Sequence, residues 1–187
     1  MRALLLAVMF VALAACGASQ WRELALSDAG FSVLMRGQPR YVRQPVDTPA
    51  GKMEAHLYSS DRRDSFFAVG YSDYPLTLVV GVPPQQLFSG VRDTWVRRID
   101  GKLITQDSGL RLAGKYPGLE FTARGTVNGA EAFMQARLYL VDQRLYQVIA
   151  MGRTSEVPQG VVNRFLNSFR LIDEGQVGSV RIEPAGK

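Results

Sequence analysis

The stretch from Leu119 to Met151, LEFTARGTVNGAEAFMQARLYLVDQRLYQVIAM, decides the fold class of this 187-residue chain. Asn128-Gly129 is a strong hairpin signal, because both central positions of a type I′ turn need a positive φ, which these residues tolerate. Strands are therefore predicted around Leu119–Val127 and Ala132–Val141. A second turn then brings the chain back into Leu145–Met151. The stretch predicts antiparallel strands joined by tight turns.

The last of these strands is apolar on both faces. In Leu145–Met151, apolar residues occupy odd and even positions alike, and the earlier segment Ser65–Tyr71 has the same pattern. A strand that is buried on both faces lies in the middle of a sheet, and such a sheet must be covered on both sides. We therefore expect helices above and below it.

Two segments have the spacing of amphipathic helices. After Pro83-Pro84, apolar residues recur at helical intervals as far as Ile99, and Gly101 ends the run. The second segment runs from about Pro158 to Phe169, with its apolar residues along one stripe. The predicted fold class is therefore α+β, with an antiparallel sheet sandwiched between helices.

The first fifteen residues differ in composition from the rest of the chain. A single positive charge at Arg2 precedes an unbroken apolar run from Ala3 to Ala15. This is the profile of a signal peptide. The alternative is a membrane-spanning helix, but crossing the hydrocarbon takes about 20 apolar residues and this run is shorter. We expect residues 1–15 to be a signal peptide.

The residues that end this run, Leu13-Ala14-Ala15-Cys16, resemble the lipobox of bacterial lipoproteins. The resemblance implies cleavage before Cys16, diacylglycerol on its thiol and usually a further acyl chain such as palmitate, and two or more chains make anchoring stable. The inner-membrane retention signal of that class is Asp after the cysteine, whereas this chain has Gly17. We expect a lipid anchor on the non-cytoplasmic side of the cell envelope, on the outer membrane facing the periplasm where there are two membranes.

Cysteine content and charge limit the remaining possibilities. Cys16 is the only cysteine, so lipidation leaves no thiol for a disulfide, a redox pair or a nucleophile. The formal net charge is +5, but the arginines are scattered, which is typical of a solvated basic surface. An exported protein does not meet nucleic acid, and no motif for binding it appears. No nucleic-acid partner is expected.

Several short patterns follow one another between Phe31 and Leu171: FSVLM at 31–35, VGYSDYP at 69–75, LFSGVRD at 87–93, PGLEF at 117–121, RLYQV at 144–148 and FLNSFRL at 165–171. In this order they resemble the PsbP-like (Mog1/PsbP) family. The resemblance implies an α/β/α domain over 29–172, whose antiparallel sheet has about six strands. An anchor and short linker at 16–28 would precede it, and a disordered tail at 173–187 would follow.

The same resemblance implies a role in binding. The best-known members of the family are non-catalytic accessory subunits on the lumenal face of photosystem II, and another is a nuclear-transport adaptor. The fold is thus a scaffold, and fold alone does not fix function. The shared motifs are chiefly apolar residues, Gly and Pro, so they carry the fold and identify no site.

Catalytic motifs are not visible in the sequence. His56, the only histidine, lies on the polar side of a predicted strand beside Glu54. We interpret it as a surface histidine, with a general base or metal ligand as the alternative. The sequence has no GxSxG elbow, paired-histidine zinc spacing, phosphate-binding glycine loop or calcium loop. The expectation is no catalytic residue, no metal and no cofactor.

One cluster is typical of a recognition loop. Tyr71, Asp73, Tyr74 and Pro75 gather where a predicted strand ends, although an ordinary strand-ending turn is the alternative. We therefore expect a membrane-anchored envelope lipoprotein that acts as a non-catalytic binding or assembly scaffold for a protein partner in the envelope. The competing hypothesis is a small-ligand carrier or hydrolase with a site that the sequence does not reveal.

Overall fold

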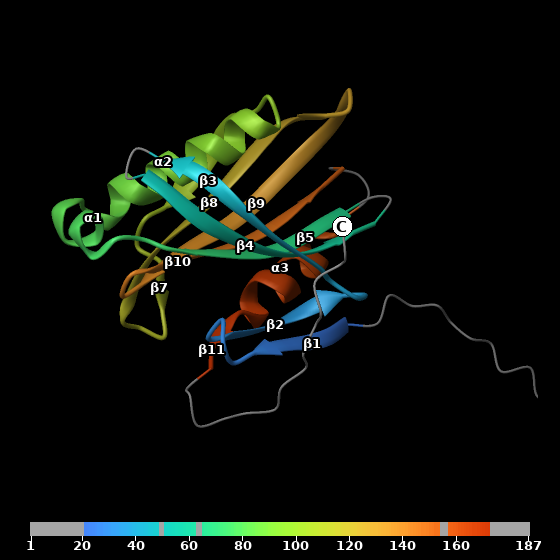
Figure 1. Ribbon diagram of the computed structural model, residues 1–187. Coiled ribbons are helices and arrows are strands. Elements are labelled where there is room, and N and C mark those ends of the chain that lie inside the picture. Colours follow the sequence, from blue (N-terminus) through green and yellow to red (C-terminus); the bar gives the residue numbers. More distant parts are fainter. Residues whose placement is uncertain (1–20, 49–50, 63–64, 154–156, 173–187) are drawn as a thin grey trace, which may run out of the picture.

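The computed structural model describes residues 21–48, 51–62, 65–153 and 157–172 (Figure 1). The predicted signal peptide at 1–15, the lipid-attachment residue Cys16 and the predicted tail at 173–187 lie outside the described residues. Those three predictions therefore stay predictions.

A curled antiparallel sheet of eight strands forms the body of the molecule (Figure 1). Its central neighbours β5 and β10 come from distant parts of the sequence, and Val69 lies opposite Val148. Seven strands follow one another across the sheet, and β7 pairs with β8 off this path. In spatial order, with β7 last, the strands are β3 (Arg40–Thr48), β4 (Gly51–Asp61), β5 (Ser65–Asp73), β10 (Arg144–Gly152), β9 (Ala130–Val141), β8 (Tyr116–Val127), β6 (Lys102–Asp107) and β7 (Arg111–Leu112).

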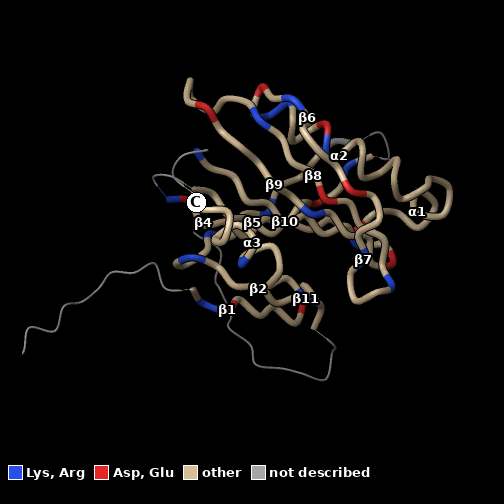
Figure 2. Tube along the Cα trace, turned by 180° about the vertical axis from the view of Figure 1, so that it is seen from behind, with Lys and Arg blue, Asp and Glu red and all other residues tan. Residues whose placement is uncertain are grey.

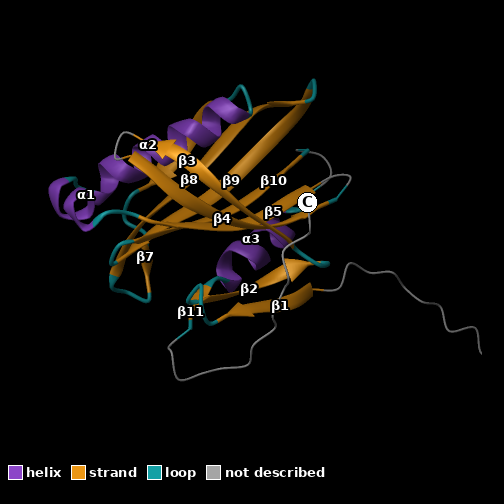
Figure 3. Ribbon diagram, viewed as in Figure 1, coloured by secondary structure: helices purple, strands orange, loops and turns teal. Residues whose placement is uncertain are grey.

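A second, three-stranded sheet lies below the first, as Figure 3 shows by colouring the strands orange. It consists of β1 (Trp21–Leu26), β2 (Phe31–Arg36) and β11 (Arg170–Leu171), with β2 in the middle. β1 lies within the range 16–28 that the sequence assigned to an anchor and linker, and it pairs with β2 along its whole length. The helices are α1 (Leu76–Gly81), α2 (Pro84–Arg98) and α3 (Gln159–Ser168).

Each face of the large sheet has its own hydrophobic core. On one face, Phe88, Trp95 and Ile99, from α2 and its end, pack against side chains of β8, β9 and β10 such as Phe121 and Ile149. Because these strands present an apolar residue at every second position, one side of each strand is available to α2. The α2 helix thus covers this face, as the sequence predicts.

The other core contains α3 and the small sheet. Phe165 of α3, Phe31 of β2 and Val148 of β10 are fully buried in it. Ile149, the next residue, is fully buried in the opposite core, so β10 is apolar on both sides. Every residue that the structure shows in either core lies between Trp21 and Leu171. A chain that starts at Gly17 therefore keeps all of them.

The prediction of an α/β/α sandwich of about six strands overstates the helices. On one face α2 is the main cover, with Val79 of α1 at its edge, and on the other face α3 shares the cover with a second sheet. The physical reason is that a two-sided strand pattern demands an apolar cover without specifying its kind. In β2, Phe31, Val33 and Met35 all turn toward the core, so this strand supplies the cover that a helix was expected to give.

Local predictions from turns and periodicity agree with the structure more closely. Asn128 and Gly129 have φ values of 52° and 76° at the β8–β9 turn, as a type I′ turn requires. Helix α2 begins at Pro84, and α3 follows Pro158. The six-residue helix α1 was not predicted.

Candidate recognition site at the end of strand β5

The four residues of the predicted recognition loop do not form one exposed loop. Tyr71 lies inside β5 and is only 8% exposed, and Asp73, the last residue of that strand, is exposed. Tyr74 is half-buried and packs against the α2 core, whereas Pro75 is exposed and directly precedes α1. The structure therefore presents Asp73 and Pro75 to solvent and uses the two tyrosines for packing. Their role in recognition stays a prediction.

Arg144, at the start of β10, is the residue that organises this end of the sheet. The strand register places it opposite Asp73, and its Nε and Nη2 donate to the two carboxylate oxygens at 2.6 and 2.8 Å. The guanidinium carbon lies 4.5 Å from the centre of the Tyr71 ring. Asp73, by accepting these hydrogen bonds, raises the pKa of Arg144 above its ordinary range.

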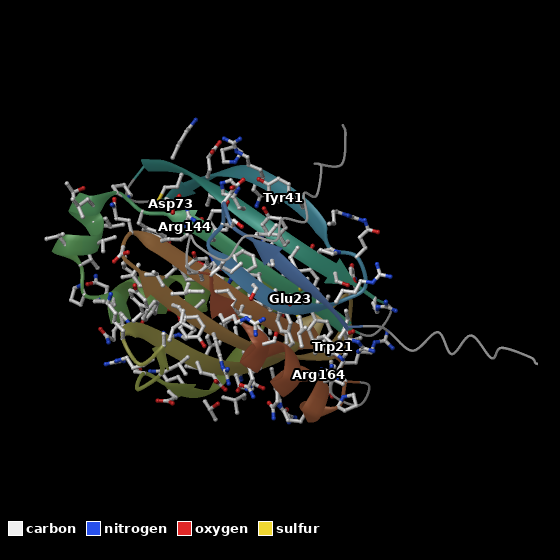
Figure 4. The ribbon with its side chains drawn as sticks, turned by 90° about the horizontal axis from the view of Figure 1, so that it is seen from below. Trp21, Glu23, Tyr41, Asp73, Arg144 and Arg164 are labelled. Atoms are coloured by element: carbon white, nitrogen blue, oxygen red, sulfur yellow. The ribbon has the colours of Figure 1, made fainter. Side chains whose placement is uncertain are left out.

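Arg144 also ties the large sheet to the small one. Its Nη1 donates to the backbone carbonyl of Ala29, in the turn between β1 and β2, at 3.2 Å. The Tyr146 hydroxyl donates to the same carbonyl at 2.8 Å. Figure 4 shows Arg144 and Asp73 close together at one end of the molecule. Sequence reasoning missed Arg144, since nothing local links it to a partner 71 positions away.

An aromatic stack continues from Tyr71 across the neighbouring strands. The His56 ring on β4 lies parallel to Tyr71, with 4.4 Å between ring centres, and the Tyr41 ring on β3 lies 6.1 Å from His56 between ring centres. The Tyr41 hydroxyl is 2.8 Å from His56 Nδ1. Burial, and then the positive charge of Arg43, lower the pKa of His56 below its ordinary value. His56 is therefore a packed, neutral imidazole at pH 7.

This geometry determines what the cluster offers chemically. The Arg144 guanidinium is engaged by Asp73 and a carbonyl, whereas the Asp73 side chain stays 58% exposed and can still accept a hydrogen bond from outside. Burial raises the pKa of Tyr71 and of Tyr146, so both keep their protons at neutral pH. The arrangement suits binding of a donor at Asp73.

Helix α1 adds an apolar surface directly beside this cluster. Val79 turns inward and packs at the edge of the α2 core. Leu76 and Val80, one helical turn apart, are 58% and 79% exposed, and the helix has no buried residue. We call Asp73, Pro75, Leu76 and Val80 together the α1 tip. The spacing of Leu76 and Val80 in the sequence fits one face of a helix, but a helix of six residues is too short for this pattern to be recognised.

Two hollows lie elsewhere on the molecule. One, of about 270 Å³, is at the β8–β9 turn, and its walls carry Asp61, Arg62, Glu131 and Arg153. The other, of about 360 Å³, lies between β1, β2 and α3. In the part of the chain that the structure describes, no group of three or more His, Cys, Asp or Glu side chains could hold a metal ion. Within the same residues, no helix is long and apolar enough to cross a membrane.

Comparisons with known proteins bear on the fold. No protein family and no curated protein matches the sequence. Among solved structures, cyanobacterial PsbP (CyanoP) from Synechocystis matches with a TM-score of 0.57 and 14% identity, over 84% of this chain and 96% of that one. PA94 of Pseudomonas aeruginosa, a protein of unknown function, matches with a TM-score of 0.37 and 9% identity, over 74% and 87% of the two chains. The chain therefore has a PsbP-like fold, as the sequence predicts.

Proposed function

We propose that this protein is a membrane-anchored envelope lipoprotein that acts as a non-catalytic scaffold and binds a protein partner through the α1 tip. The observation that carries the proposal is the exposure of Val80 and Leu76 on a helix whose only apolar packing is at its inner side. Exposed apolar side chains gathered on one helix face are a common mark of an interaction surface.

The surroundings of these two side chains support the same function. Apolar residues at the centre of an interface are usually rimmed by polar groups. Asp73 provides an exposed carboxylate two residues before Pro75, which precedes α1. Arg144 holds that carboxylate in place by two hydrogen bonds, so little side-chain freedom is lost on binding. Rigid placement of this kind favours contact with a protein surface.

A pull-down from detergent-solubilised envelope tests the partner. Leu76→Ser with Val80→Ser removes two exposed apolar side chains, and since neither is buried, the melting temperature should stay within a few degrees. The amount of partner protein captured should fall at least tenfold. The matched control is Leu103→Ser with Ile104→Ser, which removes two other exposed apolar side chains on β6. Equal loss in both variants would contradict binding at the α1 tip.

The anchor has its own test at Cys16. Cys16→Ser removes the thiol that the lipobox resemblance assigns to lipid, so we expect no acylation and loss of stable membrane attachment. Metabolic labelling with a fatty-acid analogue and membrane fractionation measure both effects. If the wild-type chain takes up no label, the lipoprotein part of the proposal fails, whereas the pull-down still tests the α1 tip.

A further inference from the structure

The first described residue, Trp21, lies at the opposite end of the molecule from the α1 tip. Figure 4 places Trp21 beside Arg164, away from Asp73 and Arg144. In Figure 1, β1 begins on the side of the molecule away from α1. The Trp21 ring is half-buried, with its edge against Phe67 at 6.1 Å between ring centres. It is the aromatic residue nearest in sequence to Cys16.

Two arginines lie against this tryptophan. The guanidinium carbons of Arg164 on α3 and Arg36 on β2 lie 5.1 and 5.9 Å from its ring centre. Arg22 is exposed and follows it in the chain. Because side chains alternate along a strand, Arg22 points to the other side of β1 but lies at the same end of the molecule. Figure 2 shows basic residues at the start of β1 and nearby. Among the described residues, neither Arg22 nor Arg164 has a carboxylate within salt-bridge distance. We call Trp21, Arg22, Arg36 and Arg164 the Trp21 face.

The hollow of about 360 Å³ adjoins this face. Arg164 and Arg170 contribute to its walls, together with the polar side chains of Asn167 and Ser168. Among the described residues that line it, the one carboxylate is that of Glu23, which accepts a hydrogen bond from Arg170 at 2.5 Å. The charge of Glu23 is therefore compensated, and the remaining field at the hollow is positive. Such a site suits a phosphate group.

The distance to the proposed anchor is short. The peptide between Cys16 and Trp21, fully extended, spans at most roughly 18 Å. If lipid holds Cys16, Trp21 cannot move further than this from the membrane surface. Arginines attract anionic lipid within about a Debye length of 8–10 Å, and a short tether makes that attraction effectively intramolecular. Tryptophan is also enriched at membrane interfaces, where its ring is partly wet.

We propose that the Trp21 face docks on the anionic phospholipid headgroups of the membrane that holds Cys16 and thereby points the α1 tip away from that membrane. The proposal rests on the anchoring under the proposed function, but the binding of the face to lipid is a property of the folded domain itself. It needs no covalent step.

Vesicle binding by the unlipidated chain from Gly17 onward tests this property. The chain should sediment with vesicles of equal parts phosphatidylglycerol and phosphatidylcholine, should not sediment with pure phosphatidylcholine, and should be released by 0.5 M salt, a concentration of roughly the order that screens surface charge. Arg22→Gln with Arg164→Gln should raise the lipid concentration for half-binding about 25-fold, or about fivefold for each arginine.

The matched control is Arg97→Gln with Arg98→Gln. Both residues are exposed at the end of α2, on the other face of the large sheet, and the change in net charge is the same. This variant should bind within about twofold of the unmodified chain, because its arginines lie away from the Trp21 face. An equal loss in both variants would overturn the docking face in favour of net charge alone.

Tryptophan fluorescence gives a second readout. The chain has two tryptophans, so Trp95→Phe leaves Trp21 as the only tryptophan, whose emission is excited selectively at wavelengths that tyrosine does not absorb. Its emission should move to shorter wavelength on phosphatidylglycerol vesicles. Absence of sedimentation, or an unchanged emission on vesicles that do sediment the protein, overturns the proposal. Because this chain carries no lipid, the outcome is independent of whether Cys16 is acylated in cells.

Discussion

The Arg144 side chain joins three segments that are far apart in the sequence. It pairs with Asp73 at the end of β5, lies over the Tyr71 ring and donates to the carbonyl of Ala29 between β1 and β2. Hydrogen bonds that involve a charged group are stronger than neutral ones, and here they connect both sheets. The position of the α1 tip therefore depends on this residue, because α1 begins at Leu76, three residues after Asp73.

His56 gives the molecule a pH dependence with a defined sign. Burial lowers the pKa of His56 below the ordinary 6.5, so the unfolded chain binds this proton more readily than the folded chain. The contribution of the neutral His56 ring to the stability of the fold is complete above about pH 6.5. It is lost as the pH falls through the pKa that His56 has in the folded chain. An NMR titration of the sole histidine should give a pKa below 6.5, and a value at or above 6.5 would contradict the packed, neutral ring.

The control for that titration is His56→Gln. This variant lacks the titrating group, so its melting temperature should fall less between pH 7.5 and 5 than that of the unmodified chain. Calorimetry at both pH values measures the difference. The comparison removes the contribution of carboxylates, which both chains share.

At the level of single residues, sequence reasoning found part of the candidate site. Asp73 and Pro75 stand out because turn residues gather where a strand ends, and both prove to be exposed. The sequence placed Tyr71 in the same loop, but Tyr71 belongs to the strand, because β5 continues to Asp73. Arg144 and Val80 could not be found, because one acts through strand pairing and the other through a helix of six residues.

The contact between β8 and the end of α2 depends on the absence of a side chain at Gly125. A Cβ there would lie 2.2 Å from the carbonyl oxygen of Ile99 and 2.7 Å from Cα of Gly101, both backbone atoms. The neighbouring Thr126 donates its N–H to the same Ile99 carbonyl at 2.6 Å. Gly125→Ala should therefore cost on the order of 1–3 kcal/mol of unfolding free energy, measured by urea denaturation.

The matched glycine is Gly90 in α2, where an added Cβ meets nothing within 4 Å. Gly90→Ala should stabilise the protein by about 0.5–1 kcal/mol, since alanine is the better helix former. Opposite changes in the unfolding free energy from the two alanine substitutions would support the packing of α2 against β8. Equal effects at Gly90 and Gly125 would argue against that arrangement.

At the level of elements, periodicity was informative where a segment was long or buried on both sides. The two-sided pattern identified β5 and β10, and helical spacing identified α2 and α3. β6 was not predicted from the sequence, because all six of its residues are exposed and its register shifts between Leu103 and Thr105. The second sheet was not predicted, because a strand that is apolar on both faces can be covered by either a helix or a sheet.

The whole molecule has two ends with different chemistry. Arginines and Trp21 lie where the described chain begins, and the apolar side chains of α1 lie at the opposite end (Figures 1 and 4). Two cores on either face of one sheet hold these ends in a fixed relation, because β10 contributes to both. Under the proposed anchoring and docking, this arrangement would hold the α1 tip away from the membrane.

Photocrosslinking in intact cells tests the central claim, that the α1 tip binds a protein partner, most directly. A photoreactive residue replaces Val80, which is 79% exposed, or, as a control, Glu131, an exposed residue at the start of β9. We expect one discrete crosslinked protein from position 80 and none from position 131. No crosslink from position 80, or the same products from both positions, would contradict it.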